Sequence, residues 1–408
     1  MKDRILIISY VYPPSTGIGG RRWSKFAKYL NKSGSDIYLL TLKPDREAVN
    51  RLNEYDSIKS VSHLKNVYPK VLGTQPNSVF EKVKYKIALL FVQVFSKGNY
   101  YDRSVFFKNQ FLNEATNLIE KHNIEKVIIT GAPFRMLYYG VLLKKKHNIR
   151  LLSDIRDPWT WGAGYGMKLL SKRRKEKELF YEKQVLIDSD VVTVPVAPML
   201  GHLQNVYSKQ ASKIKLLSHA YDLDDFEIGN ATRKLGDSYR LVYGGTTYRN
   251  LEEEYDALYE LCKSSDNVDF NIQIHTNKFQ YLNNDKKGEI KSKLEISPYI
   301  TPSEINTKIK NADAYLLIFP DEVKDFITTK FYEIIYCQTP IIFVGAKGVV
   351  SEFIVENGLG VHISPCNLKE ELNEILSGHK SISFNKNFSV EDYSFEKVTD
   401  ILVSLLEK

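Results

Sequence analysis

Residues 5–20 read ILIISYVYPPSTGIGG: a short run of aliphatic residues leads into a loop rich in proline and glycine. After this loop, apolar side chains recur three and four residues apart at Trp23, Phe26 and Leu30, as on one face of a helix. A second buried-strand pattern, DIYLLT, follows at residues 36–41. Strand, loop, helix and strand in this order predict a βαβ unit with a right-handed crossover. The chain therefore opens as a parallel α/β fold.

The same strand signature recurs along the rest of the chain, with helical patterns between the strands. Further strands are predicted at residues 126–130, 150–153, 191–194, 239–243, 270–275, 293–296, 315–318, 340–344 and 361–363. Helices are predicted from Leu251 and at residues 302–311, 329–338, 349–357 and 367–378. Because a glycine turn and a helix follow the strand at 239–243, the second half repeats the plan of the chain's opening. We therefore predict two doubly wound, Rossmann-like domains of the α/β class.

The predicted domains are residues 1–215 and 216–390, with a linker over residues 216–227. The end of the chain, residues 391–408, carries one apolar stripe at helical spacing: Phe395, Val398, Ile401, Leu402, Leu405 and Leu406. We expect this last helix to return to the N-terminal domain and to pack across its surface.

The composition is that of a globular chain with a basic excess. Of the 408 residues 43% are hydrophobic, and 57 Lys and Arg against 49 Asp and Glu give a net charge of +8. Three widely spaced cysteines argue against a disulfide framework and a zinc knuckle. The longest apolar run, residues 87–95, is too short to span a bilayer, and the N-terminus does not resemble a signal peptide. We expect a cytoplasmic protein with anionic partners.

The first glycine loop is a candidate for binding an anion. Gly19 and Gly20 precede Arg21 and Arg22, and glycine lets backbone N–H groups approach a ligand at the N-terminus of the following helix. The loop does not match G-x-G-x-x-G, which argues against a dinucleotide site. A plain β–α turn is the alternative.

A second loop of similar design, Gly244-Gly245-Thr246, precedes Arg249. Two such loops facing a cleft would suit a diphosphate. Further on, Lys330 and Glu333 lie three residues apart and so share a helix face. A lysine there suits phosphate and a glutamate suits ribose hydroxyls. An ion pair on a solvated face is the alternative explanation for these two residues.

A polar stretch, Ser153-Asp154-Ile155-Arg156-Asp157-Pro158-Trp159, lies at the end of the predicted strand at 150–153. Open α/β sheets bind ligands at the carboxyl ends of their strands, so this position favours a functional role for Arg156 and Asp157. A rigid, salt-bridged loop is the alternative. Asp188 and Asp190 have a D-x-D spacing without further ligands nearby, and no metal site is predicted.

Together, these stretches resemble a known family. Tyr-Pro-Pro with a Gly-Gly loop, Arg-Asp-Pro-Trp after a strand, the glycine turn with Arg249, and TKFYEIIYCQTP at residues 329–340 are similar to the GT-B glycosyltransferases of family four. The stretch from Ala220 to Phe226 is also similar, although His219-Ala220 stands where that family has Asn-Gly. The resemblance spans nearly the whole chain and implies the GT-B fold, with two Rossmann-like domains facing a cleft.

The resemblance also implies an activity. It implies retaining transfer of a sugar from a nucleoside-diphosphate sugar, with no metal and no other cofactor. In the family pattern Glu333 would bind the nucleotide ribose, and Arg249 and Lys330 would bind the diphosphate together with N–H groups of residues 244–247. The first glycine loop would line the cleft near the transferred sugar. Electrostatic stabilisation of the leaving diphosphate would then supply most of the catalysis.

Other candidate roles follow from position. Asp325 stands where the family has the first Glu of E-x7-E, a contact to the donor sugar, and this departure leaves the sugar open. Asp157 is the candidate for orienting the acceptor or the sugar, and for acting as general base if the reaction were inverting. Arg21, Arg22 and Arg156 are the predicted acceptor contacts.

Surface chemistry indicates the kind of acceptor. Lys82, Lys84 and Lys86 precede the apolar run at 87–95, and a second basic cluster occupies residues 172–177. Basic and apolar segments together suit an anionic bilayer, so we expect a polyprenyl-diphosphate-linked glycan acceptor at the inner face of the cell membrane. The alternative is a core helix at 87–95 with solvated charge runs. Nucleic acid is not an expected partner, because no basic-aromatic recognition module is apparent.

The resulting hypothesis is a cytoplasmic, peripheral-membrane glycosyltransferase of bacterial surface-polysaccharide assembly, making capsule, O-antigen or exopolysaccharide. Two alternatives stay open: a GT-B sugar-nucleotide epimerase, and a catalytically silent subunit that binds a nucleotide sugar. The sequence hint for the silent subunit is the departure at Asp325.

Overall fold

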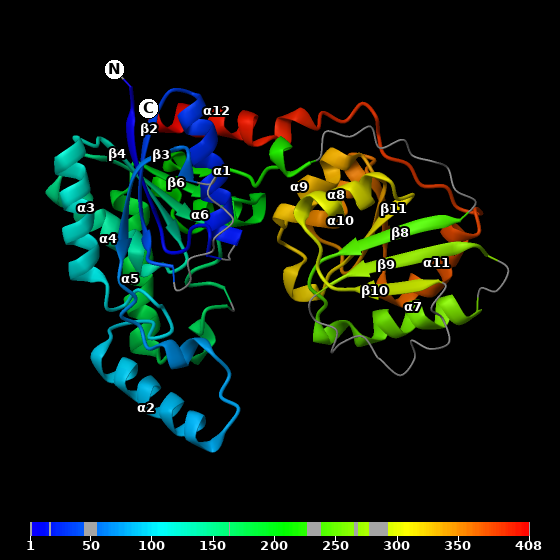
Figure 1. The fold of residues 1–408 in the computed structure, drawn as a ribbon. Coiled ribbons are helices and arrows are strands. Elements are labelled where there is room, and N and C mark those ends of the chain that lie inside the picture. The colour runs from blue at the N-terminus through cyan, green and yellow to red at the C-terminus, as the bar shows by residue number, and fades with distance from the viewer. Residues whose placement is uncertain are drawn as a thin grey trace. The chain divides into compact units, whose positions relative to one another are not determined.

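The computed structural model describes residues 2–15, 18–44, 55–162, 164–226, 238–264, 268–276 and 293–407. The chain forms two compact units, Met1–Ser218 together with Phe395–Lys408, and His219–Ser394. Each unit contains one sheet with helices on its faces (Figure 1). All strand pairs recorded among the described residues are parallel. The predicted α/β class with two Rossmann-like domains is confirmed.

The first unit is built on a seven-stranded sheet in the order β3-β2-β1-β4-β5-β6-β7. Its strands are β1 (Arg4–Ser9), β2 (Asp36–Leu42), β3 (Ile58–Leu64), β4 (Lys126–Gly131), β5 (Arg150–Ile155), β6 (Val191–Val194) and β7 (Ile214–Leu216). The central strands are buried runs of Val, Ile and Leu, as expected for a parallel sheet covered on both faces. The order of the strands reverses between β1 and β4, so this is the switch point of a doubly wound sheet.

Among the described residues, the α-helices that accompany this sheet are α1 (Ile18–Lys32), α2 (Val79–Phe95), α3 (Lys108–His122), α4 (Arg135–Lys146), α5 (Lys172–Asp188), α6 (Ala197–Val206) and α12 (Phe395–Glu407). Helices α3, α4 and α5 pack in series, and α1 packs against α12. No helix in the described part of the chain is long and apolar enough to cross a membrane.

The C-terminal helix α12 completes the first unit. Phe395 lies edge-on to Phe26 of α1, with 5.1 Å between the ring centroids. Of the predicted apolar stripe, only Ile401 is exposed. Arg150 at the start of β5 donates a hydrogen bond to the carbonyl oxygen of Leu405 over 3.0 Å. The stripe therefore packs against α1, as its helical spacing predicts.

Helix α2 covers the segment for which a bilayer contact and a core helix were the two alternatives. It begins at Val79, eight residues before the predicted apolar run, where Ser78 and Glu81 form a capping box. Only Val92 is buried, so the alternative of a core helix at 87–95 is wrong. Figure 1 shows α2 at the lower end of the first unit.

The second unit contains a six-stranded sheet in the order β10-β9-β8-β11-β12-β13. Its strands are β8 (Tyr239–Gly244), β9 (Phe270–His275), β10 (Leu294–Ser297), β11 (Ala314–Ile318), β12 (Ile341–Val344) and β13 (Gly360–Ile363). Its helices are α7 (Glu252–Ser264), α8 (Pro302–Lys310), α9 (Thr329–Cys337), α10 (Val349–Glu356) and α11 (Leu368–Leu376). The order reverses between β8 and β11, at the glycine turn that ends β8.

Alternate side chains of the strands fill two cores, one on each face of this sheet. Leu241 and Tyr243 of β8 pack with α7 and α11. Val242, between them, packs with α8, α9 and α10. This alternation explains why β8 reads as a continuous apolar run rather than as an alternating one.

The predicted linker at 216–227 is structured as far as residue 226. Leu217 still extends the first sheet, because its N–H donates to the carbonyl oxygen of Val194 over 2.9 Å. Tyr221 already belongs to the second unit and donates its N–H to Tyr393 O over 3.0 Å. Residue 227 lies outside the described residues.

Candidate functional site

The carboxyl edge of the first sheet brings together part of the predicted site. Arg156 directly follows β5, and its guanidinium donates from Nε to the Asp157 carboxylate over 3.0 Å. Tyr165 donates its hydroxyl hydrogen to the same carboxylate oxygen over 2.8 Å. A Cβ atom on Gly19 would lie 1.5 Å from Nη1 of Arg156, so the guanidinium covers the space above that glycine. Gly19, Arg156 and Asp157 therefore form one cluster.

Arg156 and Tyr165 in this cluster both keep their protons at neutral pH. Burial alone would lower the pKa of Arg156, but the Asp157 carboxylate and Tyr165 outweigh it, so the pKa is raised and the guanidinium stays charged. Burial, with Asp157 adding to it, raises the pKa of Tyr165 to about 12. Tyr165 therefore remains a hydrogen-bond donor at neutral pH. Sequence reasoning missed this residue because only the fold brings it to Asp157; its one sequence signal is a place between two glycines.

Gly20 has a different steric role from Gly19. A Cβ atom at this position would lie 2.6 Å from the backbone oxygen of Val11, so the first turn of α1 packs directly on the loop after β1. Glycine is required here by close approach of the backbone.

The loop after Asp157 is anchored by buried carboxylates of α5. Trp159 is fully buried, stacks on Phe134 with centroids 5.1 Å apart, and donates Nε1–H to Glu178 over 2.9 Å. Glu182 accepts the N–H of Thr160 over 3.1 Å. The rigid, salt-bridged loop considered as an alternative is thus present, and it holds Asp157 at the sheet edge.

Arg22 does not join this cluster. Its guanidinium is fully buried and donates to the carbonyl oxygens of Leu217 and Ser218, each over 2.7 Å. The Asp154 carboxylate lies 3.8 Å away and accepts hydrogen bonds from Trp23 and other buried donors. Arg22 therefore ties α1 to the end of the first sheet, and we remove it from the predicted acceptor contacts. Its neighbour Arg21 is half-buried.

The second glycine turn is held by its own unit. Tyr315 of β11 donates its hydroxyl hydrogen to the oxygen of Gly244 over 2.9 Å. The N–H of Gly245 donates to the carbonyl oxygen of His275 over 3.1 Å. The hydroxyl of Tyr243 donates to the oxygen of Thr246 over 2.6 Å. Of the N–H groups of residues 244–247 that were predicted to bind a diphosphate, that of Gly245 is therefore already bonded within the protein.

Helix α9 presents the other predicted donor residues. Nζ of Lys330 lies 3.6 Å from the Glu333 carboxylate, and their side chains are 28% and 6% exposed. The carboxylate is thus buried rather than on a solvated face. Helix α9 follows β11, the neighbour of β8 in the sheet, so its first turn lies at the same carboxyl edge as the Gly244 turn. Burial raises the pKa of Tyr315, which holds that turn, and the Glu333 carboxylate adds to the effect. Lys330, Glu333 and Gly244 therefore belong to one site at the carboxyl edge of β8 and β11.

The first turn of α9 favours an anion. Within the described residues, no side chain caps this end of the helix and no acidic residue lies in its first turn. The neighbouring helix α8, by contrast, begins with a capping box between Thr301 and Glu304. Because the N-terminal end of a helix carries partial positive charge, Lys330 adds to a field that the protein leaves uncompensated there.

Two predicted residues lie in turns of the second unit. Arg249 begins a turn of 3-10 helix, Arg249–Leu251, after the glycine turn, and its side chain lies outside the described part of the structure. Asp325 is exposed in the turn before α9.

Sequence reasoning missed His275, which ends β9 and shares a 2.8 Å hydrogen bond with Ser297. Burial lowers the pKa of His275, and nearby lysines, including Lys330, add to the effect.

Other sequence candidates have structural partners. Asp188 pairs with Lys145, and Asp190 with Lys144, both at the far end of α5 from Asp157. The Cys337 thiol is buried on α9, and burial raises its pKa to about 12. A cavity of about 290 Å³, lined by Tyr239, Asp313 and Pro340 among others, lies at the amino edge of the second sheet. Lys330 and the Gly244 turn lie at the opposite, carboxyl edge.

Known proteins were matched through structure and not through sequence. No protein-family model matches the chain, and no curated protein sequence matches it. Sucrose-phosphate synthase from Thermosynechococcus elongatus is similar with a TM-score of 0.61 at 13% identity, over 100% of this chain and 98% of its own. The lipopolysaccharide outer core galactosyltransferase WaaB has a TM-score of 0.61 at 12% identity, over 99% of both chains.

A protein of a different stated activity shares the same architecture. A putative UDP-N-acetylglucosamine 2-epimerase from Listeria monocytogenes has a TM-score of 0.57 at 12% identity, over 100% of this chain and 96% of its own. At identities this low the similarity establishes the fold only, and the reaction has to be inferred from the residues of the site. The chain has the GT-B fold of these proteins, with two Rossmann-like domains.

Proposed function

We propose that the protein is a retaining glycosyltransferase that moves a sugar from a nucleoside-diphosphate sugar to a lipid-linked glycan. The product would be a bacterial cell-surface polysaccharide. The observation that carries this proposal is the site at α9, where a lysine, a buried carboxylate and an uncompensated helix N-terminus meet beside the Gly244 turn. Solved glycosyltransferases of the same fold support it.

The chemistry of the α9 site suits a nucleoside diphosphate. Lys330 and the first-turn N–H groups of α9 would bind phosphate oxygens and stabilise the charge that develops on the leaving diphosphate. Glu333 would accept hydrogen bonds from the ribose hydroxyls, because a carboxylate accepts two at once. Arg249 would add a second cation, and Thr246 and Asp325 would lie toward the sugar. A metal is not part of this proposal, so we expect full turnover in the presence of EDTA.

The first unit would supply the acceptor side. Asp157 is held by Arg156 and Tyr165, so it can orient an acceptor hydroxyl without moving. In a retaining reaction the leaving phosphate oxygen takes the acceptor's proton, and Asp157 only positions the acceptor hydroxyl. If product analysis by NMR showed inversion at the anomeric carbon, Asp157 would instead be the general base.

The donor site is tested by isothermal titration with UDP, GDP, ADP and CMP. We expect one nucleotide to bind, and Glu333→Gln to raise its Kd about 10- to 100-fold, the effect of losing a hydrogen bond to a charged group. Glu371→Gln is the matched control, because Glu371 also pairs with a lysine, Lys380, at 2.8 Å. Equal affinity of the wild type and Glu333→Gln would reject the assigned site.

The epimerase alternative is favoured by the shared architecture with a putative epimerase. It predicts that a UDP-sugar changes configuration without any acceptor. A silent subunit predicts binding with no turnover on any acceptor. We expect neither: the donor sugar should stay intact until an acceptor glycan is added, after which Lys330→Met should slow transfer more than it weakens binding.

A further inference from the structure

Helix α2 exposes a continuous apolar face. Eight of its residues are between 48 and 79% exposed: Val79, Phe80, Val83, Ile87, Leu90, Phe91, Val94 and Phe95. At about 100° per residue these eight fall within an arc of about 160°, and we call this set the outer face of α2. Single exposed apolar residues are ordinary, but a contiguous patch of this kind marks an interaction surface.

The opposite side of the same helix fixes it to the first unit. Val92 is buried in a cluster with Tyr100 and Met167, and Leu89 packs against that cluster. Arg174 of α5 clamps the C-terminal end, donating to the carbonyl oxygens of Gln93, Ser96 and Gly98. The outer face is therefore presented by a helix that is held in place, and it is not simply the unpacked side of a frayed segment.

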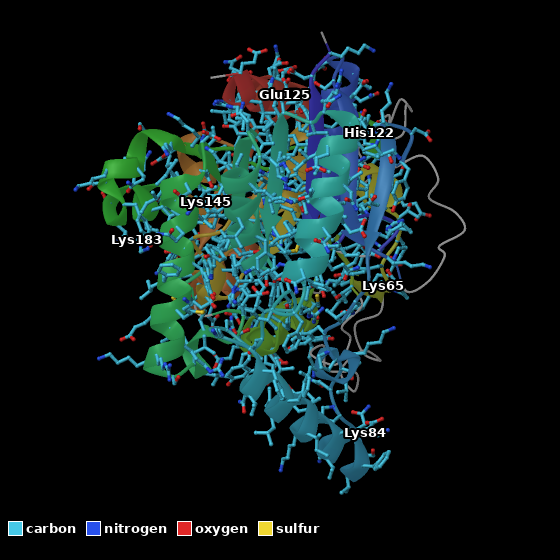
Figure 2. All side chains as sticks on the ribbon, turned by 90° about the vertical axis from the view of Figure 1, so that its left-hand side faces the viewer. Lys65, Lys84, His122, Glu125, Lys145 and Lys183 are labelled. Carbon is cyan, nitrogen blue, oxygen red and sulfur yellow. The ribbon has the colours of Figure 1, made fainter. Side chains whose placement is uncertain are left out.

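Positive charges border the outer face. At helical spacing Lys82 and Lys86 lie beyond the Val79 edge of the arc, and Lys84 lies within the arc near its Phe95 edge, with its Nζ 4.2 Å from the centre of the Phe80 ring. Figure 2 shows Lys84 on α2 at the lower end of the view. The Arg174 clamp also brings the exposed residues Lys172 and Arg173 near the helix end.

Acidic charge is kept off this face. Glu81, the one acidic residue of the helix, lies about 40° beyond the Phe95 edge of the arc. Its carboxylate is used at the helix start, where it accepts the N–H groups of Asn77 and Ser78. An apolar face with lysines at its edges, and with its one nearby carboxylate engaged in the helix cap, is the pattern of a helix that lies in a bilayer interface.

We propose that α2 docks the protein on an anionic lipid bilayer, with its outer face in the acyl boundary and the bordering lysines at the headgroups. A second copy of the chain is a poorer occupant, because a contact through the outer faces would place Lys82, Lys84 and Lys86 of both copies in one interface with no acidic residue on either face to pair with them. Long lysine side chains can instead reach the headgroups while their stems stay on apolar surface. The proposal adds to the proposed function the surface on which a lipid-linked acceptor would be met, but vesicle binding does not depend on transferase activity.

The test uses the full chain and vesicles of phosphatidylcholine, either alone or with about one third phosphatidylglycerol. Co-sedimentation gives the partition coefficient. We expect binding to the anionic vesicles and at least about tenfold weaker binding to neutral ones. Leu90→Gln/Val94→Gln should reduce binding at least about tenfold. Val206→Gln/Val355→Gln is the matched control, because it removes two equally exposed valines from other helices and should leave binding unchanged.

The lysines are tested separately. Lys82→Ala/Lys86→Ala should weaken binding to anionic vesicles about 25-fold, at about fivefold per lysine, and raised salt should weaken the wild type in the same direction. Lys121→Ala/Lys209→Ala removes the same charge at exposed positions away from α2 and should change binding little. In Phe91→Trp, the new tryptophan should shift its emission to the blue on anionic vesicles.

Three outcomes would overturn the proposal. The first is equal binding to neutral and anionic vesicles, and the second is binding that Leu90→Gln/Val94→Gln leaves intact. The third is a dimer in sedimentation equilibrium that the same double variant dissociates, which would assign the outer face to a second copy. Nucleotide binding without vesicle binding would reject the docking surface and leave the proposed transferase function intact. Vesicle binding without nucleotide binding would reject the proposed function and leave the docking surface intact.

Discussion

Replacing Glu178 by alanine should destabilise the first unit more than any surface change. Its carboxylate accepts hydrogen bonds from Arg135 Nη2 at 2.6 Å, from the Asn99 N–H at 2.8 Å and from Trp159 Nε1 at 2.9 Å. The side chains of Arg135 and Glu178 are only 5% and 1% exposed. Removing the carboxylate therefore leaves a buried guanidinium without its counter-ion and strands two further donors.

The expected magnitude follows from these contacts. Breaking a buried ion pair by removing one partner costs about 3–5 kcal/mol. Each stranded donor costs about 1–3 kcal/mol, although such terms do not add fully because the site relaxes. We expect Glu178→Ala to lower the free energy of unfolding by at least about 4 kcal/mol. For a unit of this size that corresponds to a drop in Tm of about 8–16 °C.

Tryptophan emission provides the assay. All three tryptophans of the chain, Trp23, Trp159 and Trp161, lie in the first unit, so their fluorescence during urea unfolding reports that unit alone. Glu176→Ala is the control, because this exposed residue lies on the same helix two positions earlier. It should change stability by less than about 0.5 kcal/mol.

A double-variant cycle decides the cause. If the ion pair dominates, Arg135→Ala and Glu178→Ala should together cost clearly less than the sum of their separate effects, with a coupling of about 2 kcal/mol or more. Additive effects, or a Glu178→Ala midpoint close to that of Glu176→Ala, would refute the reasoning.

Three further changes test other contacts. Burial raises the pKa of Glu182, so the folded state binds a proton more tightly than the unfolded state. The protein therefore loses stability as the pH rises through the window between the pKa values of the unfolded and folded states. Glu182→Gln should remove that loss, which would be measured as a smaller fall in Tm between pH 4 and pH 8. Gly19→Ala should push aside the Arg156 side chain, which is flexible, and so reduce turnover with a stability change below about 1 kcal/mol. Gly20→Ala meets the fixed backbone of Val11 and should cost about 2 kcal/mol or more in urea unfolding; equal stabilities of the two glycine variants would contradict this distinction.

The strands that the sequence predicts well are those buried on both faces. Strands β1 and β6, with the sequences RILIIS and VVTV, are short runs rich in Val, Ile and Leu, and all but the first residue of β1 are buried. The edge strand β3, with the sequence IKSVSHL, was not predicted because it mixes apolar and polar residues, of which only Leu64 is buried, and carries no continuous apolar signal. Strand β7 has only three residues and was missed for its shortness.

The site was predictable as residue types but not as contacts. The spacing of Lys330 and Glu333 predicts a shared helix face, and the 3.6 Å separation confirms it. The burial of Arg22 depends on packing against a segment 195 residues away, and the hydroxyl that Tyr165 brings to Asp157 depends on the path of a loop; local periodicity encodes neither. For the same reason the sequence could not tell that the N–H of Gly245 has a partner inside its own unit.

The first unit is discontinuous in the chain, and this sets an order for its synthesis. Phe26 and Tyr29 of α1 are covered by Phe395, which leaves the ribosome only after the whole of residues 219–394. The second unit is contiguous, and its two ends meet where Tyr221 bonds to Tyr393. It can therefore be complete while the first still lacks its last helix. Until those final residues emerge, the nascent chain holds one finished unit and one with an apolar face awaiting α12.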